Sequence, residues 1–177
     1  MNEYLKQLHQ KISEHHQRVE KNYPQGMTCK NGCSRCCYVD LSVFTVEAQY
    51  IRDWFSGLES SKKTDIAELW KKEVRTQENF FGKTVEACPF LKDESCTIYE
   101  ARPVICRTQG LPLKFTEDNE PAVDACPLNF ENDELEFEDC LDLDRLNLIL
   151  ATLQRQSGAE GRVRLKDLLE ELIKTQK

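Results

Sequence analysis

The chain has 177 residues, of which 40% are hydrophobic and 31% are charged, and its formal net charge is −7. These values predict one soluble globular domain with a core of its own, and no apolar run is long enough to span a membrane. An acidic chain without a basic stripe argues against nucleic-acid binding. Twelve acidic residues and no Lys or Arg fall within residues 117–144, which we expect to be a solvated face or a docking patch for a basic protein partner.

The first expected element is a helix over residues 2–22, because Leu5, Leu8, Ile12 and Val19 fall near helical spacing on one face. This segment is too polar for the apolar core of a secretory signal, so we expect a cytoplasmic protein. It carries all three histidines, which we expect at the surface rather than on a metal.

The segment CKNGCSRCC follows at residues 29–37 and carries four of the nine cysteines. In a reducing compartment, such density indicates metal binding or redox chemistry more than disulfides. Whether the segment is a loop or a helical turn, its spacing predicts that the four thiols converge. Neighbouring side chains diverge, so Cys36 and Cys37 either serve different metals, or one of them binds while the other packs.

Beyond this segment, residues 39–44 read as an extended stretch and residues 45–56 as a helix. A second helix is expected over residues 60–81, with Ile66, Leu69, Trp70 and Val74 facing inward.

Residues 83–130 lose this periodicity, and Pro, Gly and Cys punctuate them. Short strands are expected at 88–91 and 96–99 around a turn, followed by a helical segment over 99–107 with Pro103 in its first turn. Residues 110–127 read as loop.

Two further helices are expected at about 139–156 and 165–176, joined by a flexible connector. The predicted fold class is therefore mostly α: a helical domain with a central loop-rich cysteine region at about 26–130, C-terminal helices at about 139–177, and at most a short β-hairpin.

The cysteines suggest two clusters, which need not be separate. The first contains Cys29, Cys33, Cys36 and Cys37, and the second contains Cys88, Cys96, Cys106 and Cys126. Four thiolates can make a closed zinc site or hold one [4Fe-4S] cluster. Arg35, Arg102 and Arg107 are candidate donors to the sulfurs. The ninth cysteine, Cys140, lies in a leucine-rich segment and is expected to pack as a small apolar residue.

The CxxxCxxC spacing of Cys29, Cys33 and Cys36 also occurs in radical S-adenosylmethionine enzymes. Arg35 stands where those enzymes usually have an aromatic residue, and the rest of the chain lacks their alternation of strands and helices.

CKNGCSRCC, followed by CPFLKDESCTIYEARPVICR, resembles the signature of the YkgJ-like cysteine-cluster family, whose members are described as zinc- or iron-chelating domains. The resemblance covers about residues 26–130, and Ser95 stands where the family usually has Gly. It implies chelation by eight cysteines: Cys29, Cys33, Cys36, Cys37, Cys88, Cys96, Cys106 and Cys126.

The first functional hypothesis is a metal-binding protein that holds zinc, iron or an iron–sulfur cluster in a structural, sensing or metal- and redox-handling role. The second is an iron–sulfur-dependent protein-modifying enzyme, because flagellin lysine N-methylases resemble this family, although no catalytic constellation or nucleotide loop is evident. The third is a thiol redox switch.

Overall fold

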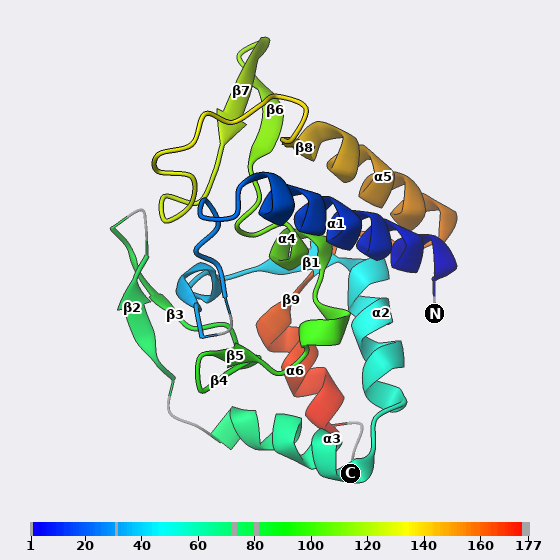
Figure 1. The fold of residues 1–177 in the computed structure, drawn as a ribbon. Helices are drawn as coiled ribbons and strands as arrows, with labels where there is room; N and C mark the ends of the chain where they lie inside the picture. The colour runs from blue at the N-terminus through cyan, green and yellow to red at the C-terminus, as the bar shows by residue number, and fades with distance from the viewer. Residues whose placement is uncertain (1, 31, 72–73, 80–81, 175–177) are drawn as a thin grey trace. The chain divides into compact units, whose positions relative to one another are not determined.

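The computed structural model describes residues 2–30, 32–71, 74–79 and 82–174. These residues form two compact units, each described by itself below (Figure 1). Unit 1 comprises residues 31–103 and 158–177, and unit 2 comprises residues 2–30 and 104–157. None of the described helices is both long enough and apolar enough to cross a membrane. The expectation of a single domain stays a prediction.

Unit 1 is built from short helices and two-stranded sheets around one core. Its elements are η1 (Arg35–Cys37), β1 (Ser42–Phe44), α2 (Thr45–Ser56), α3 (Ser60–Ala67), η2 (Glu68–Lys71), β2 (Thr76–Glu78), β3 (Thr84–Glu86), β4 (Leu91–Lys92), β5 (Ser95–Cys96), η3 (Tyr99–Ala101), β9 (Arg162–Arg164) and α6 (Leu165–Lys174). The antiparallel pairs are β1 with β9, β2 with β3, and β4 with β5.

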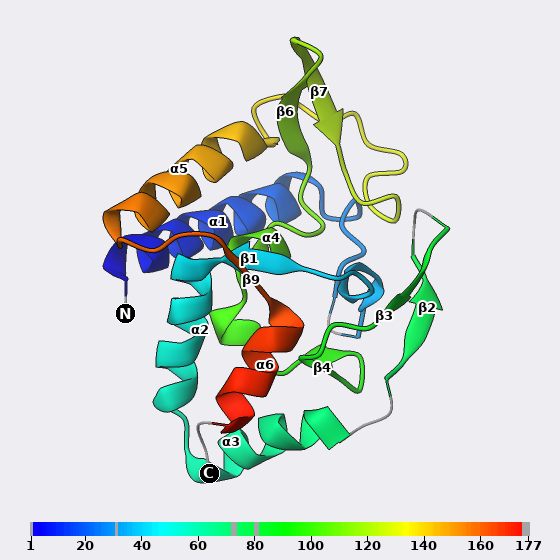
Figure 2. The ribbon, with the colours of Figure 1, turned by 180° about the vertical axis from the view of Figure 1, so that it is seen from behind.

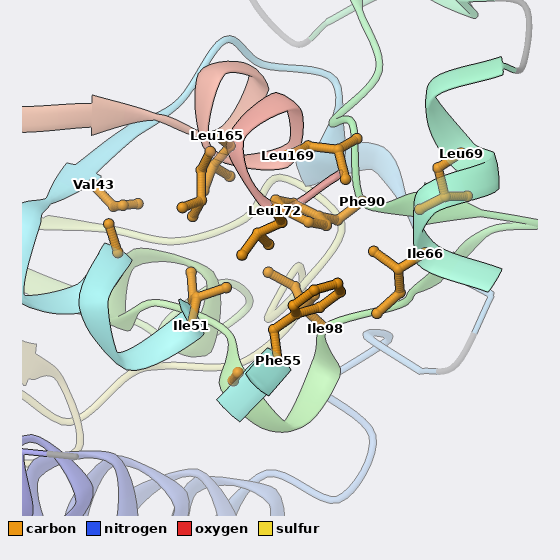
Figure 3. Close-up of a cluster of buried hydrophobic side chains, with 13 residues drawn as sticks. Val43, Ile51, Phe55, Ile66, Leu69, Phe90, Ile98, Leu165, Leu169 and Leu172 are labelled. Carbon is orange, nitrogen blue, oxygen red and sulfur yellow. The ribbon is translucent and has the colours of Figure 1, made fainter. Parts of the chain in front are cut away.

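The core of unit 1 lies between α2 and α6. Figure 3 shows Leu165, Leu169 and Leu172 of α6 facing the side chains of α2, with Phe90 among them. Phe90 is fully buried, and Ile98 is nearly so. Burial of this apolar surface is the main stabilising contribution to the unit, and it fixes the segments on either side of Phe90 and Ile98.

Unit 2 contains the two longest helices. Its elements are α1 (Glu3–Asn22), α4 (Val104–Arg107), β6 (Leu113–Glu117), β7 (Glu120–Asp124), β8 (Leu141–Asp142) and α5 (Leu143–Gln156). α1 and α5 lie side by side in both views (Figures 1 and 2). β6 pairs with β7 in antiparallel fashion and with β8 in parallel fashion, which makes a three-stranded mixed sheet.

Hydrogen bonds fix the ends of these two helices. The Asn2 side chain caps α1 by accepting a bond of 3.2 Å from the Leu5 amide, and Asp142 caps α5 by accepting one of 2.8 Å from the Arg145 amide. Both bonds satisfy backbone donors that a helix N-terminus leaves without a partner.

Several elements confirm the sequence predictions. The helices expected at 2–22, 45–56 and 139–156 are α1, α2 and α5, although α5 begins at Leu143. The hairpin expected from strands at 88–91 and 96–99 is present, but the bounds of its strands were wrong: β4 and β5 lie at 91–92 and 95–96, next to a turn at Asp93 and Glu94. The helix expected at 165–176 is α6, and the end of that prediction lies outside the described residues.

The predicted fold class, mostly α with at most a short hairpin, is wrong. The described residues contain six α-helices together with four small sheets, one of them three-stranded and mixed. Two stretches account for most of the difference, residues 74–86 and residues 110–127.

The helix expected over 60–81 ends early. α3 and η2 stop at Lys71, and a hairpin of β2 and β3 follows. Val74, expected to face inward, is 56% exposed. Residues 72–73 and 80–81 and the side chain of Trp70, all part of that prediction, lie outside the described residues. In this hairpin Thr76 pairs with Glu86 and Gln77 pairs with Val85. Thr and Val favour strands, which is consistent with a hairpin in place of the helix.

The region expected to be loop, 110–127, contains the five-residue strands β6 and β7. Asp118 and Asn119 form the connection, and both have positive φ values, 51° and 66°. A two-residue hairpin turn requires this backbone conformation, which Asp and Asn tolerate better than most residues. The segment expected as one helix over 99–107 is likewise divided, into η3 and α4, because Pro103 interrupts it.

Candidate metal centre

Two cysteines of unit 1 are brought together by the β4–β5 hairpin. Its register pairs Leu91 with Cys96, and the Leu91 amide donates a hydrogen bond of 3.0 Å to the Cys88 carbonyl. Phe90 and Ile98, each two positions from one of these cysteines, belong to the buried core, and Cys88 and Cys96 pack against it as partly buried residues. The hydrophobic core therefore positions both sulfur atoms.

The turn of this hairpin explains why Ser95 can replace the family's usual Gly. The residues with positive φ are Asp93 (49°) and Glu94 (59°), whereas Ser95 lies in β5. The left-handed conformation that favours Gly is therefore needed before position 95 and not at it.

A short turn carries Cys36 and Cys37 to the same place. Residues 35–37 form a single 3₁₀ turn, and the Cys88 amide donates a hydrogen bond of 2.7 Å to the Cys37 carbonyl. A side-chain contact adds to this link: Ser34 donates to the Glu94 carboxylate, which also accepts a bond of 2.7 Å from Arg75. The CKNGCSRCC segment and the hairpin are thus joined at two points.

The four thiols interact with one another. The adjacent Cys37 thiol lowers the pKa of Cys36, and the positive charge of Arg102 lowers it further. The Cys36 thiol in turn raises the pKa of Cys37, and burial and the nearby thiols of Cys88 and Cys96 raise it further. Burial, with smaller contributions from Cys96 and Cys36, raises the pKa of Cys88 to about 12.

Burial and the neighbouring thiols oppose the ionisation of Cys37 and Cys88, and a bound cation would offset both effects. Four sulfur donors suit a soft divalent metal or an iron–sulfur cluster by their chemistry. The arrangement is not itself a closed coordination shell: within the described part of the chain, no three Cys, His, Asp or Glu side chains are disposed to hold one ion. The donor set therefore fits such a metal in chemistry, and the side chains would have to turn to enclose it.

Three of the predicted ligands lie in unit 2. The sulfur of Cys29 touches Asn129, whose side-chain amide donates to it across 3.4 Å. The carbonyl of Cys126 accepts a hydrogen bond of 2.8 Å from the backbone amide of Asn129. Cys106 lies in α4. All three side chains are partly buried.

The model of the family described as "CxxCxxCC: Putative zinc- or iron-chelating domain" matches residues 28–127, which is more than half of the chain. The chain belongs to this zinc- or iron-chelating family. The matched range contains all eight cysteines predicted as ligands and excludes Cys140. No curated protein and no solved structure matches the chain.

Members of both predicted clusters meet in unit 1, because the structure brings Cys36 and Cys37 together with Cys88 and Cys96. Cys33 is a partly buried residue of the same unit. Cys140 is 3% exposed, and its sulfur donates to the Glu136 carbonyl across 3.6 Å, as expected of a packing residue.

Residues around the cysteines modify the sequence expectations. His9 and His15 are buried, whereas all three histidines were expected at the surface. Arg102, a predicted donor to the sulfurs, lies 3.7 Å from the centre of the Tyr99 ring and acts on Cys36 through its charge. Burial and the positive charge of Arg107, another predicted donor, lower the pKa of His9 in unit 2. Asn129 was not predicted from the sequence. Its position three residues after Cys126, in a segment that contains Pro127, is the sequence feature that could have indicated it.

A cleft of about 740 Å³ opens beside Cys88 in unit 1. Its lining includes the apolar Leu69, Leu165 and Leu169 and two ion pairs, Arg164 with Asp40 (2.9 Å) and Lys166 with Glu86 (3.1 Å). Of the four cysteines in unit 1 that interact, Cys88 lines this cleft.

Proposed function

We propose that the chain chelates zinc or iron through cysteine thiolates, with Cys36, Cys37, Cys88 and Cys96 as one site in unit 1. Cys29, Cys33, Cys106 and Cys126 complete the proposed ligand set. The role is structural, sensing or metal- and redox-handling, in a reducing cytosol. No nucleic-acid or membrane partner is part of the proposal, and the protein partner expected at residues 117–144 stays a prediction.

The observation that carries the proposal is the meeting of Cys37 with Cys88 and Cys96. Cys37 and the two hairpin cysteines come from segments about 50 positions apart. A backbone hydrogen bond of 2.7 Å nevertheless joins the Cys88 amide to the Cys37 carbonyl, and the thiols of Cys88 and Cys96 raise the pKa of Cys37. Cysteines that served only as apolar residues would gain nothing from being placed together, and clustered thiols are prone to oxidation.

A bound zinc or iron would supply positive charge that stabilises all four thiolates at neutral pH. The chain's own residues supply the rest: the β4–β5 hairpin orients two sulfurs, the 3₁₀ turn at 35–37 presents the other two, and the core beneath excludes water from one side. A [4Fe-4S] cluster would use the same four sulfurs, so the type of bound metal is determined by metal analysis and not by the arrangement of the sulfurs.

The deciding measurement is metal analysis of protein purified without oxygen, with an absorption spectrum and an acid-labile sulfide assay. Colourless protein with zinc supports the chelation proposal in its structural or storage form. Brown protein with iron and labile sulfide supports the cluster form. Protein without any metal, which also fails to take up zinc or iron when reconstituted, contradicts the proposal.

Substitution identifies the ligands. We expect Cys88→Ala to lower the metal content of unit 1, because it removes one of the four interacting sulfurs. Cys140→Ala is the matched control, since it removes a buried thiol that lies outside this group. Equal metal content in the two variants would exclude Cys88 as a ligand.

A thiol redox switch is the second candidate, and the lowered pKa of the exposed Cys36, which is adjacent to Cys37, favours it. Peroxide would oxidise the pair to a disulfide, with two electrons and two protons passing to the peroxide to give two molecules of water. Metal-free protein that loses thiols quickly on peroxide treatment and regains them with reductant supports the switch. Unreactive thiols in metal-loaded protein count against it.

A further inference from the structure

Asn129 of unit 2 occupies an unusual position for a polar side chain, because it is 5% exposed. It ends the turn Cys126-Pro127-Leu128-Asn129, which is closed by the 2.8 Å bond from its own amide to the Cys126 carbonyl. Pro127 occupies the second position of this turn, where its fixed φ is favourable. The turn thus fixes the backbone from which the Asn129 side chain extends toward Cys29.

The orientation of the Asn129 amide is set by two backbone groups of opposite character. Its oxygen accepts a hydrogen bond of 3.0 Å from the Thr28 amide, and its nitrogen donates one of 2.7 Å to the Gly110 carbonyl. Reversing the amide would face donor with donor and acceptor with acceptor, so only one orientation is compatible with both neighbours.

This orientation aims an N–H group at the Cys29 sulfur. One hydrogen of the Asn129 nitrogen is used by the Gly110 carbonyl, and the same nitrogen lies 3.4 Å from the sulfur, as a donor. The Asn129 oxygen already accepts from the Thr28 amide at 3.0 Å and lies 2.9 Å from the Thr28 hydroxyl, whose single proton is shared with the Leu128 carbonyl at 2.7 Å. The Cys29 sulfur is farther from this oxygen, at 3.8 Å, than from the Asn129 nitrogen, at 3.4 Å, so Asn129 is better placed to donate to the sulfur than to accept from it.

Gly110 lies next to both the Cys29 sulfur and the Asn129 amide nitrogen. A Cβ atom at position 110 would lie 2.7 Å from the sulfur and 3.2 Å from the nitrogen, and the φ of Gly110 is +90°. Glycine at this position therefore leaves the space in which the amide nitrogen approaches the sulfur. A side chain at position 110 would displace one or both of these groups.

We propose that Asn129 is a positioning residue for the metal-binding sulfur of Cys29, to which it donates an N–H···S hydrogen bond from the outer shell of the site. This role rests on the proposed function, because it assigns Asn129 to a cysteine in the predicted ligand set. Asn129 lies outside the range matched by the family, residues 28–127, and it differs from the predicted arginine donors because it is neutral. Donors to metal-bound ligands orient them and typically change metal affinity by about 10–100-fold when they are removed.

The test compares two variants of the full chain. Asn129→Asp keeps the size of the side chain and replaces the donor to sulfur with an oxygen. Thr28→Val is the matched control: it removes the hydroxyl bonds to the Leu128 carbonyl (2.7 Å) and to the Asn129 oxygen (2.9 Å), yet leaves the N–H···S bond. Any effect of merely loosening this region appears in both variants.

Cobalt(II), added to reduced protein without oxygen, is the probe of the site. Asn129→Asp is expected to bind it about 10–100-fold more weakly than Thr28→Val does. Loss of the hydrogen bond raises the energy of the sulfur lone pairs, so the sulfur-to-cobalt charge-transfer band should also move to lower energy in Asn129→Asp alone. Equal affinity and identical bands in the two variants overturn the proposal.

Alkylation of the metal-free protein provides an arm that needs no metal. The rate at Cys29 is measured by mass spectrometry, with Cys126 as internal reference. The Asp carboxylate disfavours a thiolate beside it, so the relative rate at Cys29 should fall about tenfold or more in Asn129→Asp and stay near the wild-type value in Thr28→Val. An unchanged rate shows that Asn129 does not act on this sulfur. Wild-type protein that takes up no cobalt, zinc or iron overturns the proposed function and with it the metal role of Asn129.

Discussion

In unit 2, the surroundings of His9 determine its pKa, and those of Gly110 determine which substitutions that position tolerates. His9 is 5% exposed on the buried face of α1. Burial, together with the positive charge of Arg107, lowers the pKa of His9 from 6.5 to about 3. The ring is therefore neutral in the folded protein over the whole physiological range of pH.

This shift predicts a loss of stability in acid. The unfolded chain binds a proton at His9 below its ordinary pKa of 6.5, whereas the folded chain does not until about pH 3. The stabilising contribution is thus complete above pH 6.5 and is lost as the pH falls toward 3. Between about pH 7 and about pH 4.5 we expect wild-type protein to lose roughly 2–3 kcal/mol more unfolding free energy than His9→Gln. Urea unfolding of the metal-free, reduced proteins measures this difference, and parallel pH profiles would contradict it.

Gly110 gives a second prediction at this scale. Gly110→Ala combines a φ of +90° with a Cβ only 2.7 Å from the Cys29 sulfur, so we expect a loss of about 2 kcal/mol or more and displacement of that sulfur. Gly158→Ala is the control, because its φ is +68° with no heavy atom within 4 Å of the added Cβ. Urea unfolding and metal analysis should show that only Gly110→Ala also lowers metal content. Equal effects of the two substitutions would mean that backbone strain alone matters.

Among the elements, the β4–β5 hairpin connects the core of unit 1 to the cysteines. Phe90, between Cys88 and Leu91, is fully buried, and its carbonyl accepts bonds of 2.9 Å from both the amide and the hydroxyl of Thr97. A hairpin this short has few ladder hydrogen bonds of its own, so its position depends on packing against α2 and α6.

We therefore expect Phe90→Ala to reduce both stability and metal binding. The lost side chain leaves a cavity that costs about 3–5 kcal/mol, and the segment from Cys88 to Cys96 loses its anchor. Phe137→Ala, at a position 49% exposed, should change stability by about 1 kcal/mol at most and leave the metal content unchanged. Chemical denaturation and metal analysis test both statements. Normal metal content in Phe90→Ala would show that the cysteines hold their positions without the core.

An element could be predicted from the sequence where its residues follow a clear hydrophobic periodicity. α1, α2, α5 and α6 each carry an apolar stripe at helical spacing, so their positions could be predicted. β2, β3 and β7 are mostly exposed, β6 is half-buried only over its first three residues, and the turn at Asp118 and Asn119 lacks the glycine that usually marks a hairpin. Their pairing is decided by cross-strand contacts, which local sequence does not contain.

At the scale of the whole molecule, the two compact units do not require a metal in order to possess cores. Unit 1 buries α2 against α6, and unit 2 buries apolar residues of α1 and α5. The cysteine motifs predicted the family, but not that Cys36 and Cys37 meet Cys88 and Cys96, because that contact depends on the path of the chain between them. Asn129 escaped prediction for the same reason.

These cores lead to a prediction for metal removal. Chelation should leave most of the helical circular dichroism at room temperature, unlike a zinc finger, which unfolds without its metal. Restoring metal at about 1,000 times its dissociation constant should add about 4 kcal/mol to the unfolding free energy and raise Tm accordingly. Circular dichroism and calorimetry measure both effects. Collapse of the helical signal on chelation would show that the metal creates the fold.

The pairing of β1 with β9 joins Val43 to Val163, about 120 residues later in the chain. During synthesis, residues 36–37 and 88–96 leave the ribosome long before Leu165 and the rest of α6 exist. Since α6 supplies one side of the core against which Cys88 and Cys96 pack, a nascent chain presents its reactive sulfurs before it can enclose them. Capture of a metal ion at that stage would shield these thiols from oxidation and draw the two cysteine segments together ahead of the last helix.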